Sequence, residues 1–299
     1  MDSAKCTALL KALELGNLSA AADALGYTPS GISRMMAALE QELGFPLLIR
    51  SKSGVTPTSD CIRLMPAFTE LAAAGRALEE TAAHIRGAEV GTVRMGTAYP
   101  QFYGVLAGIL ADFGREHPRI RVELSLANST PLARRLESHA IDLCLISRRE
   151  GNFDWEPLFQ DEHVALVSAQ HPLAHAAALP ITRFAEDDFI EVYPGEESDN
   201  SRLLARHGII PNTRFTVIDT QAAHELVAAN LGITLMNSLY AKDLDGRIRI
   251  LPLDPPASVE IGIASAPEAI QPPSVRAFAK FALPRLRKAD KRPGVICRL

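Results

Sequence analysis

Residues 17–50 read NLSAAADALGYTPSGISRMMAALEQELGFPLLIR, and this stretch decides the fold of the N-terminal part of the chain. Four apolar residues recur here at the spacing of one face of a short helix, namely Leu18, Ala21, Ala22 and Leu25. A glycine follows directly, at the position where helices commonly end in a left-handed residue. The pattern predicts a short helix that ends at this glycine.

A second helix is predicted immediately afterwards. Thr28 can cap its free amides, and Pro29 fits the first turn, where a missing N–H costs nothing. The inward face consists of Ile32, Met36, Leu39 and Leu43. The outward face is short and polar, and it consists of Ser30, Ser33, Arg34 and Ala37. Such a face, with a single forked cation, suits insertion into a major groove of DNA.

Two short helices joined by a tight turn form the helix-turn-helix arrangement, whose second helix reads base edges near its N-terminus. Helix pairs of this shape also occur as structural units without a nucleic-acid role. Periodicity alone therefore leaves DNA binding and a purely structural helix pair as open alternatives.

The individual residues favour the first alternative. AAADAL at 20–25, SR at 33–34 and LEQELGFPLLIR at 39–50 resemble the N-terminal signature of LysR-type transcriptional regulators, without a gap. The resemblance implies a winged helix-turn-helix domain over residues 1–58 that binds double-stranded DNA. In that interpretation Ser30, Ser33 and Arg34 read bases, and Thr28, Arg50 and Lys52 hold phosphates. The family usually has Gln-Pro where this chain has Pro29-Ser30, so Pro29 belongs to the expected DNA-binding face but the base preference does not transfer.

Charge gives this interpretation little support. The net charge is −4 and the isoelectric point is near 6.1. The N-terminal 57 residues contain five basic residues (Lys5, Lys11, Arg34, Arg50, Lys52) and five acidic ones (Asp2, Glu14, Asp23, Glu40, Glu42). Attraction to phosphates must then come from the local placement of Arg34, Arg50 and Lys52.

The rest of the predicted N-terminal domain is a helix over 3–15 and two short strands, 47–50 and 55–58, with turn residues between them. The strands form a wing that contacts the DNA backbone or the minor groove, or else an ordinary exposed hairpin. A long helix follows over 59–87, with Ile62 and Met65 among its candidate buried residues. Leu71, Leu78 and Ile85 recur at spacings of seven, as expected of a helix paired with a partner helix.

The resemblance makes 59–88 the linker helix that joins two subunits, so we expect a homodimer or homotetramer. A long amphipathic helix packed on its own domain is the alternative. Pro66 lies inside the pattern, and we expect it to kink or loosen the first turns.

From residue 89 onward, strand-like and helical runs alternate, which predicts βαβ units with a mostly parallel sheet. The order of these runs resembles the effector-binding half of the same family, which shares its architecture with periplasmic solute-binding proteins. The expected fold class is therefore α/β, with a two-lobed domain over 89–299. Lobe I is expected at about 89–164 and 266–299, and lobe II at about 165–265.

In open α/β sheets, ligands bind beyond the carboxyl ends of strands, beside helix N-termini. This rule selects ten candidate effector-binding residues, namely Thr97, Ala98, Tyr99, Asn128, Ser129, Thr130, Ser147, Tyr193, Asp219 and Thr220. Ser129 and Thr130 precede a proline, so capping a helix is the alternative role for each. Arg148 and Arg149 would favour an anionic small molecule, or are solvated surface charges.

Other sites receive no support. His171 and His175 flank Pro172, which argues against a shared helix face, so no metal site is expected. The acidic stretch 186–199 is expected to be a solvated loop, and the basic C-terminal residues from Arg285 onward a solvated tail. Nucleotide-binding, hydrolase and metal motifs are absent from the sequence, so we expect neither a catalytic site nor a cofactor.

Four scattered cysteines indicate a reduced cytoplasmic protein, and no export signal or membrane span is evident. Together these patterns predict a sequence-specific DNA-binding transcriptional regulator, controlled by a small-molecule effector bound between two α/β lobes. The alternative is a cytoplasmic small-molecule-binding module of the solute-binding type without a DNA role.

Overall fold

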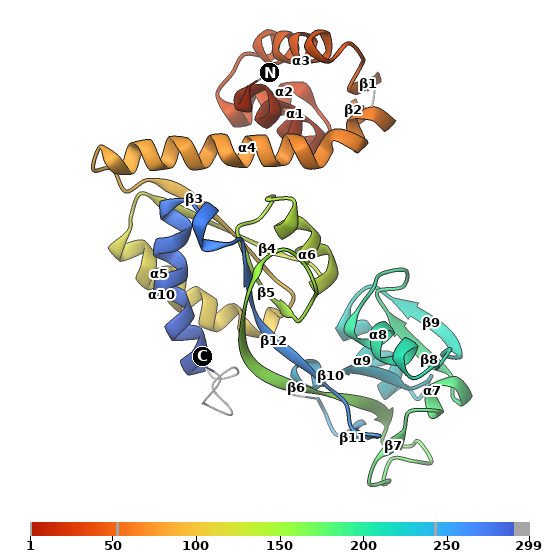
Figure 1. The fold of residues 1–299 in the computed structure, drawn as a ribbon. Coiled ribbons are helices and arrows are strands. Elements are labelled where there is room, and N and C mark those ends of the chain that lie inside the picture. Colours follow the sequence, from red (N-terminus) through yellow and green to blue (C-terminus); the bar gives the residue numbers. More distant parts are fainter. Residues whose placement is uncertain (1, 52–53, 242–243, 290–299) are drawn as a thin grey trace.

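The computed structural model describes residues 2–51, 54–241 and 244–289. A small helical domain at the N-terminus lies on one side of a long helix, and a larger α/β part lies on the other side (Figure 1). The long helix, α4 (Ser59–Ile85), contacts both. In the described ranges, no helix combines the length and apolar character needed to cross a bilayer.

The N-terminal domain contains the predicted elements. They are α1 (Ser3–Leu15), α2 (Leu18–Leu25), α3 (Pro29–Leu43), β1 (Leu48–Ser51) and β2 (Gly54–Pro57). Each helix begins with a side-chain cap, because Asp2, Asn17 and Thr28 accept from free amides of the first turn. The three helices end at glycines in the left-handed conformation, as the sequence predicts for α2.

The core of this domain includes the beginning of α4. Buried Leu9, Ile32 and Met36 pack in one cluster with Cys61 and Phe68 of α4. Two of the expected partner-facing residues, Met65 and Leu71, also pack there. Pro66 does not end α4, which the structure gives as one helix from Ser59 to Ile85.

The far half of α4 has a different surface. Leu78 is 71% exposed and Ile85 is 81% exposed, although both are apolar. This half contacts the α/β part through polar groups. Glu80 accepts from the Ser274 hydroxyl at 2.5 Å and from Thr92 N at 3.2 Å, and Arg76 lies 3.7 Å from Asp142.

The α/β part contains six helices and ten strands within the described residues. The helices are α5 (Tyr103–Glu116), α6 (Ser129–Glu137), α7 (Arg183–Glu186), α8 (Asp199–Arg206), α9 (Thr220–Ala228) and α10 (Pro273–Ala289). The strands are β3 (Gly91–Thr97), β4 (Ile120–Leu126), β5 (Leu143–Ser147), β6 (Asp154–Ser168), β7 (Leu179–Pro180), β8 (Phe189–Val192), β9 (Thr213–Val217), β10 (Thr234–Asn237), β11 (Ile248–Asp254) and β12 (Ser258–Ser265).

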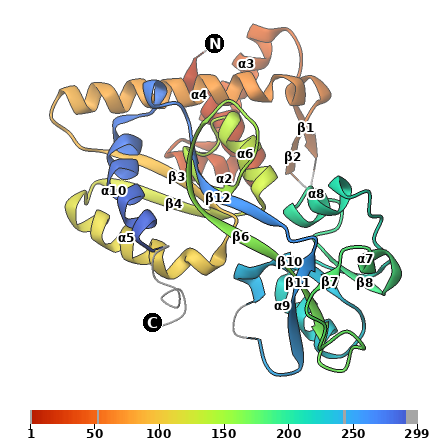
Figure 2. The ribbon, with the colours of Figure 1, turned by 60° about the horizontal axis from the view of Figure 1, so that its bottom comes forward.

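The expectation of a mostly parallel sheet is wrong for this part, since the sheets are mixed. β3 pairs in parallel with β4 and β5, and β8 pairs in parallel with β9. β12, however, is antiparallel to both β5 and β6, and β10 and β11 are antiparallel to β6. Three of these four antiparallel pairings involve β6, a strand of 15 residues that runs from one lobe into the other (Figure 2).

The sequence predicts only the second half of β6. Residues 163–168 are apolar enough to suggest a buried strand, whereas the preceding DWEPLFQDE lacks a clear alternation. Its partner β12 also lies elsewhere than expected. Ile261 and Ile263 pair with β5 and pack in the core of lobe I with Phe102 and Phe113, so residues 258–265 pack with lobe I although the sequence assigns them to lobe II.

Lobe II packs around two apolar clusters on the two sides of its strands. Phe184, Phe189 and Leu203 belong to one, and Ile190 and Val227 to the other. The basic residues near the C-terminus are only partly as expected. Arg285 and Arg287 lie in α10, and Arg287 forms an ion pair with Glu156; the end of the predicted tail lies outside the described residues.

Candidate DNA-binding face and ligand pocket

The outward face of α3 is exposed at its N-terminus. The Thr28 hydroxyl accepts from Gly31 N at 3.1 Å and lies 3.2 Å from the Ser30 hydroxyl. Pro29 occupies the first turn, as its position in the sequence predicts. In Figure 1, α3 lies on the far side of the N-terminal helices from the α/β part.

Two arginines lie beside this face. Arg34 is exposed, and its Nε donates to the carbonyl oxygen of Ser30, one turn earlier in the same helix. Arg50, at 45% side-chain exposure, comes from β1, and its Nη1 donates to the Ser33 hydroxyl at 3.5 Å. Arg50 from the wing thus contacts α3 at Ser33, which is half-buried and directly precedes Arg34 in the sequence. Lys52 lies outside the described residues.

Glu40 fixes the position of the wing relative to α3. Its Oε1 accepts from Leu47 N at 2.8 Å and from Leu48 N at 3.1 Å, and its Oε2 lies 3.9 Å from Arg50. This acidic side chain thus holds the beginning of β1 against α3.

A pocket lies between the two lobes, with a volume of about 60 Å³. Its lining combines hydroxyls, amides, one arginine and one carboxylate with a few apolar side chains. The lining residues are Ala98, Tyr99, Asn128, Ser129, Arg149, Val192, Tyr193, Ser198, Asp199, Asn200, Thr220, Met236, Asn237 and Tyr240.

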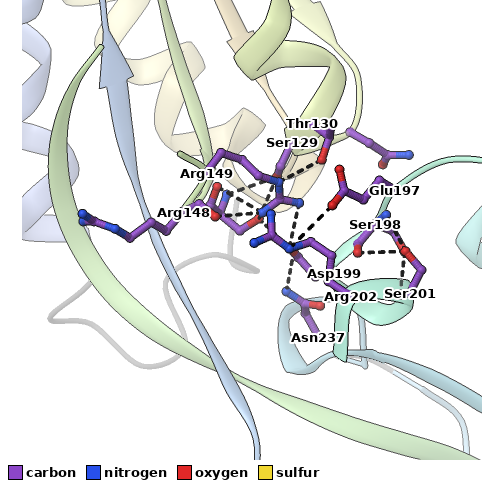
Figure 3. A network of polar contacts seen from close by, with 12 residues as sticks. Ser129, Thr130, Arg148, Arg149, Glu197, Ser198, Asp199, Ser201, Arg202 and Asn237 are labelled. Carbon is purple, nitrogen blue, oxygen red and sulfur yellow. Dashed lines mark hydrogen bonds and ion pairs between the residues drawn. The ribbon is translucent and has the colours of Figure 1, made fainter. Parts of the chain in front are cut away.

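Arg149 is the buried cation of this pocket (Figure 3). Its Nη2 donates to Asp199 Oδ1 at 2.9 Å, its Nη1 to the Ser147 hydroxyl at 2.7 Å, and its Nε to the Thr130 hydroxyl at 2.8 Å. The expectation of a solvated surface charge is therefore wrong for Arg149. Arg148 points elsewhere, toward Glu260 and the ring of Trp155.

Asp199 accepts from four side chains. Its Oδ1 accepts from Arg149 and from the Ser147 hydroxyl at 2.6 Å, and its Oδ2 accepts from the Tyr99 hydroxyl at 3.3 Å and from Asn237 Nδ2 at 3.4 Å. It is the first residue of α8, a helix capped by Ser198. The expectation of a solvated loop over 186–199 is wrong at this end, since Asp199 lies at the centre of the pocket network.

The six predicted candidates that line the pocket are Ala98, Tyr99, Asn128, Ser129, Tyr193 and Thr220. The other four lie behind the lining and position it. Thr97 accepts from Tyr99 N, Thr130 and Ser147 hold Arg149, and Asp219 caps α9 by accepting from Ala222 N. Tyr193 has a positive φ of 59°, a conformation uncommon for residues other than glycine.

The capping role considered for Ser129 and Thr130 is wrong, because α6 begins at Ser129 itself. Asn128 occupies the capping position but makes no capping bond. Its Nδ2 instead donates to Glu196 Oε2 at 2.5 Å, on the opposite lobe. The Ser129 hydroxyl accepts from Ser147 N at 3.1 Å.

The polar pocket residues that the sequence did not predict come from lobe II, several of them from the beginning of helix α8. Ser198, Asp199 and Asn200 lie at the beginning of α8. Asn237 is the last residue of β10, and Tyr240 follows that strand. The sequence did contain a signal for α8, because Ser198 is followed three residues later by Ser201, with which it forms a capping box.

Burial governs the ionisable groups near the pocket. It raises the pKa of Tyr99 well above its usual value, with the Asp199 charge adding to the effect, and burial likewise raises the pKa of Tyr240. Both phenols are therefore neutral hydrogen-bond donors. Burial also raises the pKa of Cys61 to about 11 and that of Cys144 to about 12, so these thiols are poor nucleophiles.

Both parts of the chain match known families. The model of the LysR substrate binding domain matches residues 86–287, and that of the bacterial regulatory helix-turn-helix protein, lysR family, matches residues 5–61. Among curated relatives, the HTH-type transcriptional regulator CbbR of Rhizobium meliloti (strain 1021) is 25% identical over 283 residues, covering 90% of this chain and 88% of its own.

Solved structures share the fold. Full-length OxyR from Pseudomonas aeruginosa, in a variant form, superposes with a TM-score of 0.68 at 18% identity, covering 99% of this chain and 96% of that chain. The effector binding domain of QuiR in complex with shikimate superposes with a TM-score of 0.54 at 23% identity, covering 67% of this chain and 98% of that chain. Since the substrate-binding-domain model alone matches more than half of its residues, this chain belongs to the LysR family of transcriptional regulators.

Proposed function

We propose that this LysR-type regulator reads DNA with the N-terminal half of α3. The observation that carries the proposal is a polar face, exposed at Ser30 and Arg34, that combines Ser30, Ser33 and Arg34 with Arg50 from the wing. Ser30, Ser33 and Arg34 contact base edges, while Thr28, Pro29, Arg50 and Lys52 lie along the phosphates.

The functional division assigns residues 1–58 to DNA binding and 59–88 to subunit pairing, with effector binding in the remainder. Ile62, Leu78 and Ile85 are exposed apolar residues of α4, and burying them against the same helix of a second copy would remove apolar surface from water. A dimer would then carry two α3 helices to two half-sites on DNA. Pairs of such dimers would give a tetramer. A regulator of this kind acts in the cytoplasm, where bacterial DNA is located.

The effector site is the pocket between the lobes. Asn200 indicates the chemistry of its ligand. Its Nδ2 donates to the carbonyl oxygen of Leu235 at 2.7 Å, which fixes the amide, while its Oδ1 is buried and accepts no hydrogen bond from the described residues. A ligand hydroxyl would satisfy that acceptor. Arg149 and the N-terminus of α6 would in turn favour a carboxylate.

The effector that we propose is therefore a small hydroxylated carboxylate. Shikimate has this chemistry and is bound by the effector domain of QuiR, so it is the first probe to use. A compound of this class should raise the melting temperature of the protein and change its affinity for operator DNA. If the compound raises the melting temperature but leaves the affinity for operator DNA unchanged, the protein is a ligand-binding module that does not control DNA binding.

The DNA-binding role is tested by a mobility-shift assay on DNA from upstream of the protein's own gene and its divergent neighbour, at two salt concentrations. A shifted protein–DNA band that persists in the presence of unrelated competitor DNA supports the proposal. Binding that is equally strong to unrelated DNA and disappears at the higher salt concentration would contradict specific recognition. Absence of binding at both salt concentrations would favour the ligand-binding alternative.

A further inference from the structure

The donors around the Asp199 carboxylate come mainly from the opposite lobe. Arg149, Ser147 and Tyr99 belong to lobe I, whereas Asp199 begins α8 in lobe II. A guanidinium and hydroxyls gathered around one carboxylate are the groups that proteins commonly use to bind a carboxylate ligand. Lobe I therefore holds a side chain of lobe II much as it would hold a bound anion (Figure 3).

Two further hydrogen bonds link the lobes. Asn128 donates to Glu196, and the Tyr240 hydroxyl donates to the carbonyl oxygen of Ala98 at 2.5 Å. Asp199 is therefore part of a set of contacts that holds the lobes together.

We propose that Asp199 is an internal substitute for the carboxylate of the effector. It closes the lobes by occupying the anion position beside Arg149, and an anionic effector binds by displacing it. The proposal rests on the proposed function in one respect, since it takes the pocket between the lobes as the effector site.

Displacement has a defined consequence for the fold. Arg149 is buried and each of its three nitrogens already donates a hydrogen bond, so a second carboxylate would compete with Asp199 for the guanidinium. An incoming carboxylate would release Asp199 and, with it, the beginning of α8. The effector therefore binds only when the contact between Arg149 and Asp199 is broken. It stabilises the arrangement of the lobes in which this contact is open over the arrangement in which it is closed.

The test is to remove the internal carboxylate and supply a free one. Asp199→Ala deletes the carboxylate and leaves a buried guanidinium without its charge partner. Formate has the size of the deleted group. The melting temperature of the full-length variant is measured in increasing sodium formate and in sodium chloride at the same ionic strength, beside the wild-type protein.

We expect formate to raise the melting temperature of Asp199→Ala by about 3 °C more than chloride does once the site is nearly saturated. Wild-type protein should need at least about tenfold more formate for the same gain, because Asp199 competes for the site at a high effective concentration. Equal responses of the two proteins to formate would overturn the proposal.

Asp187→Ala is the matched control. Asp187 accepts from Arg183 Nη2 at 2.5 Å, also within lobe II but outside the pocket. Its removal deletes a carboxylate from another arginine pair, so a general effect of formate on unpaired arginines would appear in it. A response of this control as large as that of Asp199→Ala would contradict a specific anion position.

A second variant covers the case in which Asp199→Ala does not fold. Asp199→Asn keeps the shape of the side chain but removes its charge, which weakens the link between the lobes. Small-angle scattering of the effector-free variant should then show a larger radius of gyration than that of the wild-type protein. An unchanged radius would overturn the proposal.

The mobility-shift assay separates this proposal from the proposed function. If Asp199→Ala does not respond to formate while the wild-type protein still binds its operator, only the role of Asp199 is overturned. A missing response to hydroxylated carboxylates, with the formate response of Asp199→Ala intact, instead overturns the assignment of the effector.

Discussion

The two candidate binding regions differ in how their charges are paired. On α3, Arg34 is exposed and donates to a backbone carbonyl of the same helix, so its charge is available to an external anion. In the pocket, Arg149 is buried and paired with Asp199 from the other lobe. One region is open to its ligand, and the other already contains a group that resembles the ligand.

This difference corresponds to the two tasks. DNA presents a regular array of phosphates, so a face that binds it can be assembled in advance and left exposed. An effector site must instead report whether its ligand is present, which requires two arrangements of different energy. A contact between the lobes that the ligand replaces provides such a pair of arrangements.

The largest difference between the pocket and the α3 face should appear in protein stability when the arginine of each is replaced by alanine. Arg149→Ala leaves the Asp199 carboxylate buried without its cation, and we expect a loss of about 3–5 kcal/mol in the free energy of unfolding of the α/β part. Arg34→Ala should change the unfolding free energy by less than about 0.5 kcal/mol, because its side chain is exposed. Urea unfolding of both variants measures the two values; similar losses would contradict the contrast.

Buried Asp142 provides a comparison with Asp199, since its carboxylate accepts from Arg94 N at 2.6 Å and has Arg76 only at 3.7 Å. Burial raises its pKa from 3.8 to about 6. The folded protein then keeps a proton that the unfolded chain loses above about pH 4, so the stability that Asp142 contributes falls as the pH rises from about 4 to about 6.

We therefore expect Asp142→Asn to gain up to about 3 kcal/mol relative to wild type between pH 4 and pH 7, at about 1.4 kcal/mol per pKa unit. Urea unfolding at several pH values measures the difference between the two proteins. A difference that is independent of pH would show that Asp142 keeps its ordinary pKa in the folded state.

A smaller loss of stability than that of Arg149→Ala is expected at the beginning of α3. Thr28→Ala removes the hydroxyl that accepts from Gly31 N, which should cost about 1 kcal/mol of stability in the N-terminal domain. Asn128→Ala is a useful counterpart, because Asn128 makes no capping bond. It should leave α6 intact and weaken the contact between the lobes. Circular dichroism during thermal unfolding checks the first variant, and scattering in solution checks the second.

The same contrast explains what the sequence could predict. The α3 face lies in one continuous segment, where Thr28, Pro29 and the spacing of Ile32, Met36 and Leu39 determine the helix and its orientation. Local rules for capping and periodicity are sufficient in such a segment. The position of Arg50 beside Ser33 depends on the wing, and it could not be predicted in detail.

The pocket depends on contacts between distant segments. Asp199 and Ser147 are 52 residues apart, and no local pattern relates them. The rule about the ends of parallel strands found residues such as Tyr99 and Ser129, because it depends on topology. It missed Asp199 and Asn237, since charge in an acidic stretch is ordinarily solvated and its burial is decided by the partner lobe.

The most direct test of DNA recognition is the affinity of the Arg34→Ala variant for an operator fragment, measured by mobility shift beside Arg115→Ala. Arg115 is an exposed arginine of α5, far along the chain from α3, and serves as the matched control. We predict that Arg34→Ala lowers specific affinity about 10- to 100-fold, which corresponds to about 1–3 kcal/mol for a base contact, while Arg115→Ala leaves it unchanged. Equal operator affinities of Arg34→Ala and wild type would contradict the assignment of α3 as the DNA-reading helix.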